Sequence, residues 1–139
     1  MPLKYQNRTG FTLIGLMVMV AIIAIIAILA AIAFAFYQNH MLTVRRGDAQ
    51  GIMLNIQALQ EKNLSNYTFY ESNLSDLGKF ESDDYAFAIK GATNTTYTIT
   101  ATAKGSQASD TGCIFMTLNQ SGLRCPGADP RCSTHADCW

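Results

Sequence analysis

The first third of the chain contains one long run of hydrophobic residues. From Phe11 to Tyr37 the sequence reads FTLIGLMVMVAIIAIIAILAAIAFAFY, with no proline and no charged residue. A helix of this length would extend about 40 Å, which exceeds the roughly 30 Å hydrocarbon core of a bilayer. Because no polar face interrupts the hydrophobic surface, the pattern predicts a membrane-spanning helix and not a soluble amphipathic one.

After this run the hydrophobic positions become periodic. They recur every three or four residues with polar residues between them, as expected for a helix with one buried stripe: Ala49, Ile52, Ile56 and Leu59. The helix is therefore predicted to continue beyond the hydrophobic run and to pack one face on a sheet. Gly47 and Gly51 weaken a helix by up to about 1 kcal/mol each, so a bend is compatible with this segment.

A polar stretch and three alternating segments complete the chain. Residues 63–84 are rich in Asn, Ser, Asp and Tyr and are predicted to be a loop. Hydrophobic residues alternate in three segments that are predicted to be strands, with turns at 91–94 and 105–112 between them: 85–89, 97–101 and 113–118. The expected fold class is α+β, with one long helix packed on a small antiparallel sheet of three or four strands.

Charge is distributed unevenly. Ten Lys and Arg balance ten Asp and Glu, but residues 9–44 carry no formal charge. The zero net charge excludes a strong overall basic field for nucleic acid. Lys4 and Arg8 precede the hydrophobic run and would remain in the cytoplasm if it spans a membrane. A cleaved secretory signal has a hydrophobic region of only about 7 to 15 residues, so a retained anchor fits better.

A motif lies where the basic leader meets the hydrophobic run. Residues 8–17 read RTGFTLIGLM, which resembles the class III signal of type IV prepilins and pseudopilins, where Gly is followed by FTLIELM. Further along, AILAAIAFAFYQ is similar to AILAAIAIPSYQ of that family. The resemblance implies cleavage by a prepilin peptidase between Gly10 and Phe11, N-methylation of Phe11, and retention of the helix as a filament core. It implies a leader at 1–10, a transmembrane and filament-core helix at 11–44, and an extracytoplasmic pilin domain at 45–139.

The motif departs from the family in three ways. Gly15 stands where the family has a Glu that pairs with the N-terminal ammonium of a neighbouring subunit, and a buried charge is costly unless it is paired. The hydrophobic segment is about three residues longer, which rotates the remaining helix face by about 60°. Ala35 replaces the usual helix-breaking Pro, and Ala24 or Ala27 the usual Gly, so an unbroken helix is expected.

All four cysteines lie near the end of the chain, at Cys113, Cys125, Cys132 and Cys138. An extracytoplasmic domain is exposed to an oxidising compartment, so two disulfides are expected, and four cysteines allow three pairings. Residues 97–113, YTITATAKGSQASDTGC, and the final Cys138-Trp139 resemble a group of minor pilins. The paired cysteines of that group imply the bridge Cys113–Cys138, which leaves Cys125–Cys132.

A zinc site is the alternative for these cysteines. Cys125, Cys132, His135 and Cys138 form the pattern C-x6-C-x2-H-x2-C, which offers four ligands that zinc accepts. The first spacing is not that of a standard finger, and Cys113 would be left unpaired. Disulfides are therefore preferred, and neither a metal nor a cofactor is expected.

Nothing in the sequence supports catalysis. Neither His40 nor His135 has a recognisable nucleophile–base context. The acidic residues of 81–84 lack the spacing of a cation-binding loop and are predicted to be solvated. Arg45 and Arg46 could meet lipid headgroups, but a solvated turn of helix is the preferred interpretation.

The leading functional hypothesis is a minor type IV pilin, a structural subunit that supports adhesion, twitching motility or DNA uptake. The alternatives are a pseudopilin of a type II secretion system and a DNA-uptake receptor pilin. DNA is weakly supported because the available cations are sparse: Lys90, Lys104, Arg124 and Arg131. The resemblance implies other pilin subunits, the prepilin peptidase, an assembly platform and membrane lipid as partners. It places the chain first in a bacterial inner membrane and then in a pilus at the cell surface.

Overall fold

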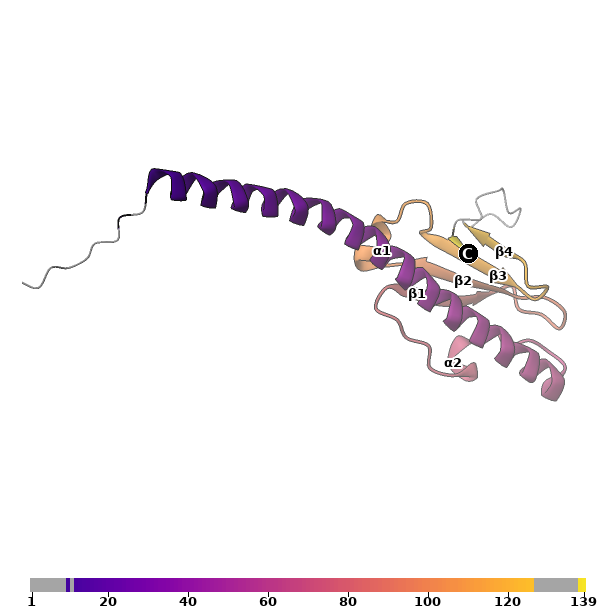
Figure 1. Ribbon diagram of the computed structural model, residues 1–139. Helices are drawn as coiled ribbons and strands as arrows, with labels where there is room; N and C mark the ends of the chain where they lie inside the picture. The colour runs from indigo at the N-terminus through magenta and orange to yellow at the C-terminus, as the bar shows by residue number, and fades with distance from the viewer. Residues whose placement is uncertain (1–9, 11, 127–137) are drawn as a thin grey trace, which may run out of the picture. The chain divides into compact units, whose positions relative to one another are not determined.

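The computed structural model describes residues 10, 12–126, 138 and 139. The chain divides into two compact units, Met1–Asn39 and His40–Trp139. The helix α1, Leu13–Tyr67, contributes residues to both units (Figure 1). It is continuous through Ala35, as the absence of a helix-breaking proline predicts.

The second unit contains a four-stranded antiparallel sheet. Its strands follow one another in space in the order of the sequence, β1-β2-β3-β4, so the sheet is a simple meander (Figure 1). This arrangement confirms the predicted α+β class and the three to four strands. Besides its part of α1, the second unit contains the following described elements: α2 (Leu74–Leu77), β1 (Tyr85–Lys90), β2 (Thr98–Ala103), the 3-10 helix η1 (Gly105–Ser109), β3 (Phe115–Asn119) and β4 (Arg124–Pro126).

The register of the strands determines which side chains form the core. Ile99 is paired with both Ile89 and Leu118, so hydrophobic residues of three neighbouring strands share one face. A slip of one residue would turn all of them to the opposite face. The same core includes Ala49, Met53 and Ile56 of α1, so the amphipathic half of the helix packs against this face.

Two of the four buried positions of α1 differ from the prediction, each by one residue. The fully buried residues are Ala49, Met53, Ile56 and Gln60, whereas Ile52 and Leu59 lie at the margin. Gln60 can be buried because both polar atoms of its amide are hydrogen-bonded. Its Nε2 donates to the carbonyl of Glu71 at 2.7 Å, and its Oε1 accepts from the Glu71 N–H at 2.8 Å. A buried polar group with its hydrogen bonds made costs little.

The predicted loop at 63–84 is partly helical. The helix α1 continues to Tyr67, and α2 forms a further turn. Thr68 has a φ of 63°, a conformation that ends the helix. The prediction failed here because Asn and Ser, which favour turns, are tolerated on the solvent side of a helix whose inner side is packed.

Candidate functional site

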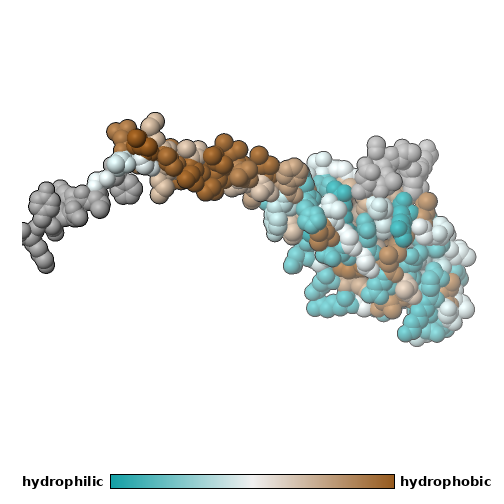
Figure 2. Space-filling model, in the orientation of Figure 1, coloured by the Kyte–Doolittle hydropathy of each residue, from teal (hydrophilic) through white to brown (hydrophobic). Residues whose placement is uncertain are grey.

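The hydrophobic half of α1 is exposed along its described length. Its large hydrophobic side chains from Leu13 to Tyr37 are all at least 47% exposed. Hydrophobic colouring covers this stretch of helix, whereas polar residues dominate the visible surface of the second unit (Figure 2). Among the described residues, α1 is the one helix long and apolar enough to cross a membrane, judged by length and composition. Such a surface requires lipid or other hydrophobic helices around it.

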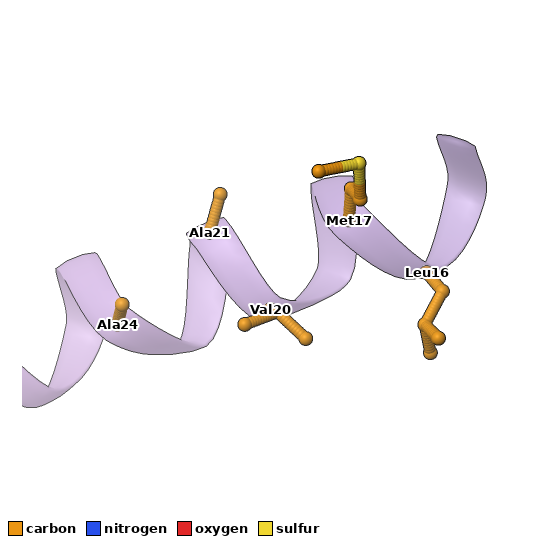
Figure 3. Close-up of a pocket in the computed structure, with 5 residues that line it drawn as sticks. All are labelled: Leu16, Met17, Val20, Ala21 and Ala24. Atoms are coloured by element: carbon orange, nitrogen blue, oxygen red, sulfur yellow. The ribbon is translucent and has the colours of Figure 1, made fainter. Parts of the chain in front are cut away.

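The first turns of this helix form a shallow hydrophobic depression. Figure 3 shows side chains of carbon and sulfur alone, projecting from successive turns of the helix: Leu16, Met17, Val20, Ala21 and Ala24. No polar atom of these side chains is available to orient a polar ligand. The depression is therefore suited to an acyl chain or to the side chains of a second hydrophobic helix.

The predicted processing site, Gly10 and Phe11, precedes this surface in the sequence. Gly10 is exposed, and Phe11 lies outside the described residues. Gly15 lies in the first turns of α1, and a Cβ placed there would meet only the Thr12 Oγ1, at 3.3 Å. The first turn of α1 contains no acidic residue, although the N-terminus of a helix favours one.

Arg45 and Arg46 bind within the second unit instead of forming a solvated turn. The guanidinium of Arg46 donates from Nε and Nη2 to the two carboxylate oxygens of Asp110, the second at 2.7 Å. Arg45 Nε lies 3.3 Å from Asp84 Oδ1, and its Nη1 donates to Ser106 Oγ at 2.8 Å. Asp110 is only 7% exposed, so this pair is shielded from water. Neither the headgroup interpretation nor the solvated one describes these side chains.

Gln107 completes this set of polar contacts. Its Nε2 donates to the main-chain carbonyl of Leu42 and to the hydroxyl of Tyr85, each at 3.1 Å. Burial raises the pKa of Tyr85, which keeps the phenol protonated at neutral pH. The sequence pattern predicts only a turn at 105–112. Asp110 is the one residue of this segment that sequence reasoning could have considered as a partner for an arginine. The arginine lies 64 positions away, so no local pattern reveals the pairing.

The acidic residues around position 83 do not form a cation site. Asp84 binds Arg45, and Glu81 pairs with Lys79 at 3.2 Å in an exposed position. No group of three potential metal ligands occurs within the described part of the chain. His40 is exposed on α1.

The described C-terminal cysteines are oxidised. Cys113 and Cys138 form a disulfide with a Cα–Cα distance of 5.6 Å. Cys125 is also disulfide-bonded, whereas Cys132 and His135 lie outside the described residues. Because Cys138 is bonded to Cys113, it is not available as the fourth ligand of the alternative zinc set.

The described cations considered for DNA lie at separate places on the second unit. Lys90 ends β1, Lys104 follows β2, and Arg124 begins β4; all three are exposed. The guanidinium carbon of Arg124 lies 5.3 Å from the ring centre of Trp139, a cation–π arrangement. The Trp139 indole N–H donates to the carbonyl of Cys125 at 3.4 Å. Arg131 lies outside the described residues.

Comparisons with known proteins agree with this architecture. A structure titled "High-Resolution Structure of a Type IV Pilin from Shewanella oneidensis" is similar in fold, with a TM-score of 0.51 and 21% sequence identity over 68% of this chain and 99% of that chain. No curated protein matches the sequence. Residues 35–117, more than half of the chain, match a family described as "Type IV minor pilin ComP, DNA uptake sequence receptor". The long helix, the four-stranded meander and this match together show that the chain belongs to that family of type IV minor pilins.

Proposed function

We propose that this minor pilin is a DNA-uptake receptor, whose second unit binds DNA outside the cell while its hydrophobic helix holds it in a membrane or a filament. The observation that carries the proposal is the family match over residues 35–117, since that family is described as a DNA uptake sequence receptor. No specific observation favours a pseudopilin of a secretion system. Pilins are structural proteins, and the proposed role requires no catalysis.

The chemistry of the second unit limits how DNA would be bound. Removing Lys4 and Arg8 with the leader would leave the chain with a net charge of −2. Binding would therefore depend on a few local cations that contact phosphates, not on the overall field of the protein. Arg124 and Trp139 together place a cation and an aromatic ring at one edge of the sheet, and both groups are used in contacts with nucleic acid.

Titration of duplex DNA with the full-length chain in detergent micelles tests this proposal. We expect binding at low salt that weakens with a slope of about −0.9 for each phosphate neutralised. Arg124→Ala should lower the affinity about fivefold and reduce the salt slope by about 1. Fluorescence anisotropy of labelled DNA measures both quantities.

Lys79→Ala is the control, since Lys79 is an exposed cation, paired with Glu81, that lies away from Trp139 in the sequence. It should leave the affinity unchanged within about twofold. An absence of binding at low salt, or an equal loss of affinity in both variants, would contradict a receptor role for this surface.

The proposed route to the membrane follows the prepilin resemblance. A prepilin peptidase would remove residues 1–10 and methylate the amine of Phe11, leaving the helix 11–44 in the inner membrane and the domain 45–139 outside. An assembly platform would then move the subunit from lipid into contact with other pilin subunits. The exposure of Gly10 supports this proposal, since a peptidase must reach its cleavage site.

Mass spectrometry of the chain isolated from membranes tests the processing step. We expect an N-terminus at Phe11 carrying one added methyl group, about 14 Da, because the retained helix begins there. A chain that still begins at Met1 would rule out processing and leave an ordinary membrane anchor.

A further inference from the structure

The helix α1 is attached to the sheet in two different ways along its length. From Ala49 to Gln60 it contributes fully buried side chains to the core. From His40 to Asp48 no side chain is fully buried. This end of α1 therefore contributes no fully buried side chain, and its hydrophobic residues Met41 and Leu42 are only half-buried.

Polar contacts hold this end instead. They include the Arg46–Asp110 pair, the contacts of Arg45 with Asp84 and Ser106, and the hydrogen bond from Gln107 to the Leu42 carbonyl, and we call these contacts the latch. Each contact joins a group on residues 42–46 to a group on the sheet side of the unit. Segments held by few hydrophobic contacts open more readily than the core does.

The sheet side of the latch is firmly fixed. The carbonyl of Asp110 accepts from the N–H of Cys113 at 2.9 Å, and Cys113 is bonded to Cys138. The N–H of Lys104 donates to the carbonyl of Asp84 at 2.9 Å. If the latch opens, the helix end is therefore the part that moves.

Two glycines follow the latch directly. Gly47 and Gly51 are exposed, and a Cβ at either position would meet no atom within 4 Å. Packing within the chain therefore does not require glycine at these positions. Glycine weakens a helix relative to alanine, and sharp bends in helices occur at such residues.

We propose that Gly47 and Gly51 form a joint in α1 and that the latch holds this joint straight. With the latch closed, residues 40–47 follow the sheet. With the latch open, they swing away while residues 53–60 remain in the core. The joint and the latch together would set the direction of the first turns of α1 in the second unit, and the fold of that unit would not change. It is independent of DNA binding.

Hydrogen–deuterium exchange of the full-length chain in detergent micelles tests the latch. In Asp110→Asn the amides of residues 41–51 should exchange about tenfold faster, because a charged hydrogen bond is lost. Residues 53–60 and β2 should remain within about twofold of the wild type. Arg45→Gln, a milder change at a half-exposed side chain, should accelerate residues 41–51 about threefold. Lys79→Gln, which removes an exposed charge outside the latch, should change none of these segments.

A second pair of substitutions tests the joint. Adding Gly47→Ala and Gly51→Ala to Asp110→Asn should restore most of the protection of residues 41–51 from exchange, since alanine stiffens the helix. Equal acceleration across residues 41–51 and 53–60, or none in either, would overturn the latch. If the alanines have no effect, the joint is overturned. If Asp110→Asn does not fold, Arg45→Gln with and without the two alanines decides both points.

Discussion

Replacing Cys113 and Cys138 together by serine is expected to lower the free energy of unfolding of the second unit by about 5 kcal/mol, the loss of the bridge and the burial of two hydroxyl groups together. The bridge closes a loop with a sequence separation of 25, and the chain-entropy model assigns about 3.5 kcal/mol to a loop of that length. A loss of this size is a large part of the total stability of a small domain. Urea unfolding of the full-length chain in micelles, followed by near-ultraviolet circular dichroism of the packed tyrosines, measures it.

The alanine pair Cys113→Ala and Cys138→Ala is the control for this result. Both cysteines are buried, 3% and 2% exposed, so serine also places two hydroxyl groups in the core, at a cost of about 1 kcal/mol or more each if they are unsatisfied. The alanine variant should retain the loss due to the bridge but not this additional cost. A loss below about 1 kcal/mol in the alanine variant would contradict a stabilising role for the disulfide.

Gly15→Glu is expected to increase the incorporation of the subunit into filaments by about thirtyfold, which corresponds to roughly 2 kcal/mol. This prediction rests on the proposed cleavage before Phe11, which would leave a free ammonium at the start of the helix. In a filament of hydrophobic helices an unpaired ammonium is costly, and a carboxylate from a neighbouring subunit would pair with it. In lipid the same carboxylate is unfavourable, so both effects favour assembly.

The structure offers room for this substitution. A Cβ at Gly15 meets only the side-chain oxygen of Thr12, which can rotate away. The first turn of α1 has no acidic residue, and a carboxylate there also interacts favourably with the helix dipole. The fraction of the chain recovered in sheared filaments, compared with the fraction left in membranes, measures incorporation.

Gly15→Gln separates charge from helix propensity. Glutamine matches glutamate in size and in its preference for helix but cannot pair with an ammonium. It should change incorporation by less than about threefold. If Gln and Glu raise incorporation equally, the absent carboxylate is not what limits the entry of this subunit into filaments.

The two modes of attachment of α1 have a consequence for assembly. A subunit that leaves lipid for a filament exchanges the surroundings of its hydrophobic helix. A polar latch next to two glycines would allow the helix to adjust its direction during that exchange, since polar contacts at 42–46 can open while Met53 and Ile56 stay buried. The Cys113–Cys138 bridge would keep the sheet side of the latch in place.

Hydrophobic periodicity was sufficient to predict the long helix and the strands β1, β2 and β3, but not α2, η1 or β4. A run of 27 residues from Phe11 to Tyr37 without charge predicts a helix surrounded by lipid or by other helices. Alternation in β1, β2 and β3 predicted the antiparallel meander, and the motif around Gly10 and Phe11 predicted the pilin family. These features are local, so they can be read over a few turns or one strand.

The tertiary structure alone decided which polar groups are paired. Gln60 is one of the polar residues between the predicted stripe positions, but it is buried because the main chain of Glu71 forms hydrogen bonds with its amide. Arg46 was expected in solvent, but it binds Asp110, which is distant in sequence. Hydrophobic burial follows from the residues of one element. A buried polar group, in contrast, is stable only where a partner from another element meets it, and that meeting is determined when the elements pack.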